Sequence, residues 1–165
     1  MHRTILRAIG FALIGLLMLG ASGLVATATE ATPEAPPAVV RTVIQEGMPS
    51  AAPGQVLQLV RYDIPAKISL PVHIHPGMQV AMVQSGTLHY TVVEGEMNYT
   101  RANGEAGVLK AGESTDFMPG DSLVEPQGMI HFGENLTDEP VVLIVASLFE
   151  AGAPPSSLVE ATPAA

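Results

Sequence analysis

The sequence predicts a single all-β domain, built as a sandwich or a closed barrel of short strands. Its middle part alternates apolar and polar residues with a period of two, as strands with one buried face do. Glycine, proline, asparagine or aspartate separates these segments, and no convincing 3.6-residue period occurs outside the N-terminal 28 residues. A chain of 165 residues is expected to form one domain. Sandwiches and barrels are the architectures that bury one face of many short strands.

About nine segments carry this alternation, and each is short enough for a strand. In chain order they are residues 39–46, 55–64, 67–75, 78–84, 87–95, 114–119, 122–126, 129–135 and 140–149. Residues 94–118 leave room for a further long hairpin with a polar tip at Ala102-Asn103-Gly104.

The N-terminus, residues 1–28, has the features of a bacterial-style signal peptide. Arg3 and Arg7 precede an uncharged apolar run, and Ala26-Thr27-Ala28 offers the small-x-small pattern of a cleavage site. An uncleaved membrane anchor is the alternative, since about 20 apolar residues can span a bilayer. In both cases we expect an exported protein that is secreted, periplasmic or held at the cell surface.

The rest of the chain divides by composition. Residues 29–38, TEATPEAPPA, are rich in Pro, Ala, Thr and Glu and predict an extended linker. Residues 151–165 repeat that composition and predict a flexible tail. The predicted β-barrel domain is therefore residues 39–150.

Charge and cysteine content exclude several functions. The formal net charge is −9, and loss of the leader leaves five basic against 16 acidic residues, hence −11. Nucleic-acid recognition needs a basic face, so no nucleic-acid partner is expected. The chain has no cysteine, which excludes disulfides, thiolate metal ligands and a cysteine nucleophile.

The stretch HIHPGMQ suggests part of a metal site. His73 and His75 are two residues apart on a predicted strand, so both side chains lie on one face and can reach one ion. Pro76-Gly77 turns the chain, and Gln79 then offers an amide oxygen as a third donor. The alternatives are a pair of surface histidines and a Gln79 that hydrogen-bonds a ligand histidine instead of the ion.

His131 is the better candidate for a further imidazole than His89, because tight turns at glycines and a proline precede it. The stretches HIHPGMQVAMVQSG and GDSLVEPQGMIHFGEN together resemble the two motifs of the cupin superfamily, in its small single-domain form. The resemblance covers residues 69–135.

The resemblance implies a jelly-roll barrel and a metal held by His73, His75, Gln79 and His131. Cupins commonly bind iron, manganese, nickel, copper or zinc. The departure is Gln79, where the family most often has glutamate, so weaker affinity and a more positive site are expected. Ligands rich in imidazole favour Zn, Fe, Cu or Ni over Mn.

Three functions stay open on these residues: a metal-binding cupin with a small-molecule pocket, a cupin enzyme such as a dioxygenase or isomerase, and a barrel with a vestigial site. Glu125 and Glu134 flank the second motif and are candidates for a general base, although acidic residues are more often solvated. No catalytic residue is identified. A small-molecule ligand and a homodimer through apolar edge strands are the expected partners, and membrane association is expected only with an uncleaved leader.

Overall fold

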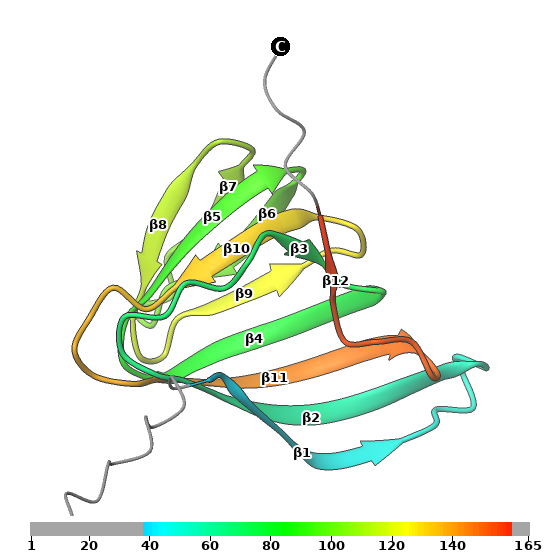
Figure 1. Cartoon of the computed structure of the whole chain (residues 1–165). Helices are drawn as coiled ribbons and strands as arrows, with labels where there is room; N and C mark the ends of the chain where they lie inside the picture. The colour runs from blue at the N-terminus through cyan, green and yellow to red at the C-terminus, as the bar shows by residue number, and fades with distance from the viewer. Residues whose placement is uncertain (1–37, 160–165) are drawn as a thin grey trace, which may run out of the picture. The chain divides into compact units, whose positions relative to one another are not determined.

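Residues 38–159 form two antiparallel β-sheets in a computed structural model of the chain (Figure 1). The predicted leader, residues 1–28, and nearly all of the linker lie outside these residues. Within them no helix is long and apolar enough to cross a membrane.

The first sheet has the strand order β1-β2-β11-β4-β9-β6-β7, and the second has the order β12-β3-β10-β5-β8. The strands of the first are β1 Val40–Gly47, β2 Gln55–Ile64, β4 Gly77–Ser85, β6 Glu96–Thr100, β7 Ala106–Lys110, β9 Ser122–Glu125 and β11 Val141–Glu150. Those of the second are β3 His73–Ile74, β5 Leu88–Glu94, β8 Ser114–Phe117, β10 Ile130–Glu134 and β12 Ser157–Leu158. This all-β, two-sheet arrangement is a double-stranded β-helix, and it confirms the jelly-roll barrel that the resemblance implies.

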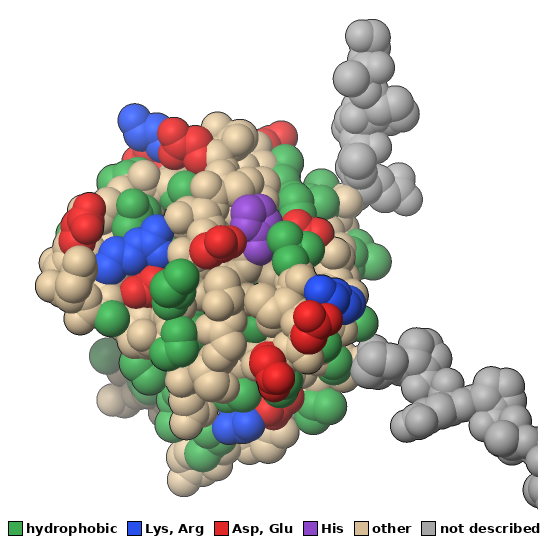
Figure 2. Space-filling view, turned by 90° about the vertical axis from the view of Figure 1, so that its left-hand side faces the viewer, with side chains coloured by type: hydrophobic (Ala, Val, Ile, Leu, Met, Phe, Trp, Pro, Cys, Tyr) green, Lys and Arg blue, Asp and Glu red, His purple; other side chains and the backbone are tan. Residues whose placement is uncertain are grey.

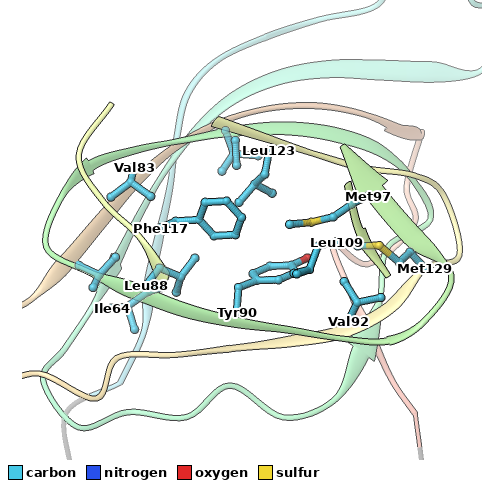
Figure 3. Packing of buried hydrophobic residues seen from close by; sticks show 13 residues of the cluster. Ile64, Val83, Leu88, Tyr90, Val92, Met97, Leu109, Phe117, Leu123 and Met129 are labelled. Atoms are coloured by element: carbon cyan, nitrogen blue, oxygen red, sulfur yellow. The ribbon is translucent and has the colours of Figure 1, made fainter. Parts of the chain in front are cut away.

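Strand alternation places the core between the sheets. Along β4 the residues alternate strictly between buried and exposed from Gly77 to Gln84, as a strand with one face in the core requires. Phe117, Tyr90, Met97 and Leu123 meet in the centre of this core (Figure 3). Burial of each such side chain contributes about 1.5–3 kcal/mol.

Two segments differ from the strands that the sequence predicts. Only His73–Ile74 of the predicted strand 67–75 pairs as a strand. Lys67 takes a positive φ of 59°, and Pro71 has no N–H to donate to a ladder, so the chain before His73 is irregular. The predicted tail, residues 151–165, contains β12, which pairs with β3.

The expected hairpin is present as β6 and β7, with its tip at Arg101–Glu105. The N–H of Arg101 donates to the carbonyl of Glu105, and Gly104 has a φ of 88°, which a residue with a side chain rarely adopts.

On the face in Figure 2, basic side chains lie singly among acidic and neutral ones.

Asp121 holds this hairpin against the turn that precedes β9. Its buried carboxylate accepts hydrogen bonds from the backbone N–H groups of Ala102 at 2.8 Å and Met118 at 3.0 Å, and from the Arg101 guanidinium at 2.9 Å. Burial by itself would raise the pKa of Asp121, but these three donors together hold that pKa below its ordinary value.

Replacing Asp121 by alanine is therefore expected to lower the free energy of unfolding by about 2–4 kcal/mol, because two backbone N–H groups and a cation lose their buried acceptor. The lowered pKa means that the wild-type contribution is present at neutral pH. It is lost as the pH falls below the ordinary value of 3.8 towards the folded-state pKa. Urea titrations at pH 7 and pH 3 measure both effects. The exposed Asp116→Ala is the matched control, and an equal loss in both variants would contradict the prediction.

Candidate metal centre

Three buried histidines meet inside the barrel, between β3 and β10. His73 on β3 lies directly opposite His131 on β10, and His75 follows β3 by one residue. One ligand nitrogen from each ring lies within 4.8 Å of the others. Their exposed fractions are 8%, 7% and 2% for His73, His75 and His131. The arrangement is consistent with a metal site and agrees with the face-sharing predicted for the His-x-His pair.

Backbone carbonyls orient all three imidazole rings in the same way. Each Nδ1 lies at hydrogen-bond distance from a carbonyl oxygen: His73 from Pro71 at 2.8 Å, His75 from Pro155 at 2.6 Å and His131 from Met129 at 3.1 Å. A carbonyl can only accept, so the proton of each neutral ring sits on Nδ1. At His73 and His131 the lone pair is then on Nε2 and free for an ion, as in ligand histidines, whereas Nε2 of His75 faces the Glu125 carboxylate.

Aromatic stacking fixes two of these rings from behind. Tyr90 stacks on His131 with ring centroids 5.3 Å apart, and Phe149 stacks on His75 at 5.7 Å. Tyr90 also belongs to the apolar core (Figure 3). The core and the histidine cluster therefore form one continuous packed unit.

Gln79 extends into the same space from β4. It is 5% exposed, and its register partner on β9 is Glu125. The Nε2 amide of Gln79 donates to the Glu125 carboxylate. Its Oε1 atom is buried and has no hydrogen-bond partner among the described residues. A buried acceptor without a donor is costly unless a cation or a ligand satisfies it.

Glu125 is the acidic side chain of this cluster. Its carboxylate accepts a hydrogen bond from the Tyr90 hydroxyl at 2.8 Å, and lies 3.3 Å from Nε2 of His75 and 3.6 Å from Nε2 of His131. Burial by itself would raise the pKa of Glu125, but the two imidazoles and the tyrosine hydroxyl hold that pKa well below its usual range. The group is therefore an anion, not the neutral acid that burial alone would produce.

The histidines respond differently to this anion. Burial lowers the pKa of His73 to about 4, with His131 acting in the same direction. Burial also lowers the pKa of His131, more than the charge of Glu125 raises it. For His75 burial lowers the pKa as well, but the hydrogen bond to Glu125 and its charge raise that pKa above the ordinary value. At neutral pH His73 and His131 are thus neutral, the state in which imidazole binds metals.

A cavity of about 240 Å³ opens beside the cluster. Apolar side chains dominate its wall, and the N-terminal Val39 and Arg41 and the C-terminal Pro155 and Leu158 contribute to it. Such a wall with a few polar groups on one side is typical of a small-molecule site.

The structure brings together the four residues singled out in the sequence, His73, His75, Gln79 and His131. Two contributors were harder to identify. From the sequence, Glu125 and Glu134 are equal candidates for a general base. Of the two, Glu125 is buried, whereas Glu134 accepts a hydrogen bond from Ser69 near the surface. The alternation in SLVEP is the available signal, because it puts Glu125 on the same face as the buried Leu123.

The contribution of Pro155 has no sequence signal. Its carbonyl contacts a ring 80 residues away, and nothing in the composition of the tail indicates that contact. His89 lies away from the cluster, where it contacts Asp116 at 2.7 Å near the surface.

The two-sheet fold with a buried histidine cluster defines a class of small β-barrel protein with a site inside the barrel. A family model described as a cupin domain matches residues 60–147. The chain belongs to the cupin superfamily. No curated protein matches it significantly over its sequence.

Solved structures with a similar fold come from several organisms. A cupin superfamily protein of Desulfitobacterium hafniense DCB-2 is 12% identical, with 68% of this chain and 78% of that one covered and a TM-score of 0.47. KdgF from Halomonas sp. is 18% identical over 66% and 77% of the two chains, with a TM-score of 0.45. The DMSP lyase DddQ from Ruegeria pomeroyi DSS-3 is 18% identical over 62% of this chain and 42% of that one, with a TM-score of 0.47.

Proposed function

We propose that this cupin binds a divalent transition metal through His73, His75, His131 and the Oε1 atom of Gln79, beside a pocket for a small molecule. The observation that carries the proposal is that backbone carbonyls orient all three imidazole rings in the same way. Each Nδ1 is held by a backbone carbonyl, and the ligand nitrogens converge in a buried space.

The donor set fits such an ion. Gln79 adds a buried oxygen that has no hydrogen-bond donor of its own in the described residues, so an ion would satisfy it. Three imidazoles and one neutral oxygen suit zinc, iron, copper or nickel better than manganese, which prefers oxygen donors. The apolar cavity of about 240 Å³ next to these donors supports a small organic ligand as the partner of the site.

Elemental analysis after reconstitution tests this function. The purified protein, offered Zn²⁺, Fe²⁺, Cu²⁺ or Ni²⁺ in turn, is expected to retain about one equivalent of at least one of them, as well-formed sites do. Less than about a tenth of an equivalent of every metal would contradict the proposal.

The His131→Ala variant is expected to lose more than about 100-fold in metal affinity, because changes to groups that only orient a ligand already cost about 10–100-fold. Chelator competition measures that affinity. His89→Ala is the matched control, since His89 lies near the surface with Asp116, and it is expected to bind metal like the parent. Circular dichroism of the metal-free variants checks that the barrel is intact.

A further inference from the structure

Glu125 is the one acidic residue among the described residues that line the cavity beside the histidines. Glu125 is 6% exposed, and no lysine or arginine lies within ion-pair distance of it in residues 38–159. Its contacts with nitrogen atoms are those to Gln79, His75 and His131, and these are the residues that face the proposed ion. A buried carboxylate of this kind is costly without a positive partner, and its partners here are imidazoles and not a lysine or an arginine.

The distances from the Glu125 oxygens to two of the imidazoles are those between ligands around one ion. Donor atoms at about 2.0–2.2 Å from a tetrahedral or octahedral ion lie about 3–3.6 Å from their neighbours. The carboxylate oxygens of Glu125 lie 3.3 Å from Nε2 of His75 and 3.6 Å from Nε2 of His131. An ion bound by His75 and His131 would therefore lie next to a Glu125 oxygen, at the edge of the close cluster that these two residues form with His73.

Strand register explains how a residue outside the first motif reaches this position. Gln79 on β4 and Glu125 on β9 are directly opposite each other in an antiparallel pair, so their side chains extend side by side into the barrel. A carboxylate at either position reaches the same space. The sequence has the amide on β4 and the acid on β9.

We propose that Glu125 is the anionic ligand of the metal centre, and that Gln79 positions it. The Nε2 amide of Gln79 donates to one carboxylate oxygen, while the Tyr90 hydroxyl donates to the other. The centre then has three imidazole nitrogens, the Gln79 oxygen and one carboxylate, and the charge that Gln79 lacks comes from the neighbouring strand. This inference rests on the proposed function, because it concerns the ligands of the same ion.

The test compares Glu125→Gln, Glu134→Gln and the exchange variant Gln79→Glu/Glu125→Gln with the parent protein. Glu134→Gln is the matched control, since it removes the same charge near His131 but outside the cavity. Chelator competition gives each affinity for Zn²⁺ and Co²⁺, and the visible spectrum of the Co²⁺ form reports the ligand set. We expect Glu125→Gln to weaken binding by about 100-fold or more and to change the Co²⁺ spectrum, and Glu134→Gln to stay within about threefold.

The exchange variant is expected to regain affinity to within about tenfold of the parent, because it restores one carboxylate and one amide on the same two strands. An unchanged affinity for Glu125→Gln would overturn the inference, as would weaker binding with an unchanged Co²⁺ spectrum, since Glu125 would then only orient other ligands. If the parent binds metal and His131→Ala abolishes binding, these outcomes leave the proposed function intact. A parent that binds no metal overturns both.

An infrared difference spectrum of the parent covers the case in which Glu125→Gln does not fold. One equivalent of Zn²⁺ is expected to shift the carboxylate stretching bands of the parent and of Glu134→Gln alike. Absence of that shift in the parent would overturn the assignment of Glu125.

Discussion

Replacing Asn135 by aspartate is expected to destabilise the barrel strongly, although the two side chains have nearly the same shape. Asn135 is 0% exposed, and its Nδ2 donates to the carbonyls of Ile64 at 3.2 Å, Pro65 at 3.0 Å and Glu139 at 2.7 Å. Its Oδ1 accepts from the N–H of Thr137 at 3.0 Å. One side chain thus joins the end of β2 to the connection between β10 and β11.

An aspartate at this position would place a buried negative charge against three carbonyl oxygens. We expect a loss of about 4 kcal/mol or more in the free energy of unfolding at pH 7, since lost hydrogen bonds and an unpaired buried charge add. The loss should be smaller at low pH, because a protonated aspartate can again donate one hydrogen bond. Urea unfolding measures it, with the exposed Asn98→Asp as the matched control. Equal stability of the two variants would contradict the role of Asn135.

Replacing Gly77 by alanine is expected to separate β4 from β11. A Cβ atom at Gly77 would lie 2.1 Å from the carbonyl oxygen of Leu148 and 3.1 Å from the Cα atom of Phe149. Both atoms are backbone, so no rotamer change relieves the contact. Overpacking in cores costs about 1–3 kcal/mol where side chains can adjust, and we expect at least the upper end here.

The same change should disturb the proposed metal centre, because Phe149 stacks on His75 and Gln79 follows Gly77 by two residues. Urea unfolding and metal titration of Gly77→Ala measure the two effects. Gly47→Ala is the matched control, since a Cβ there meets no atom within 4 Å. Equal stability of Gly77→Ala and Gly47→Ala would contradict the expected clash between β4 and β11.

Much of the fold was predictable because alternation and turn residues are local signals. β2 covers the predicted residues 55–64, and the hairpin of β6 and β7 turns where its polar tip was expected. The short β3 was not predictable from alternation, because the strain at Lys67 and the missing donor at Pro71 depend on the backbone path.

The histidine cluster was predictable to the extent that it follows strand periodicity. His73 and His75 share a face for that reason, and the second motif identified His131. The pairing of Gln79 with Glu125 depends instead on the register between two strands 46 residues apart, and the contact of His75 with Pro155 depends on the path of the C-terminal segment. Neither relation has a signature in a single sequence.

The contact between His75 and Pro155 has a consequence for how this protein can be altered. The group that orients His75 is a main-chain carbonyl, so scanning the tail by side-chain substitution would leave it in place and miss it. Shortening or rerouting the chain after Glu150 would remove it, together with the β12 pairing to His73 and Ile74. For this barrel, a change in the length of the segment after Glu150 is also a change in the surroundings of the histidine cluster.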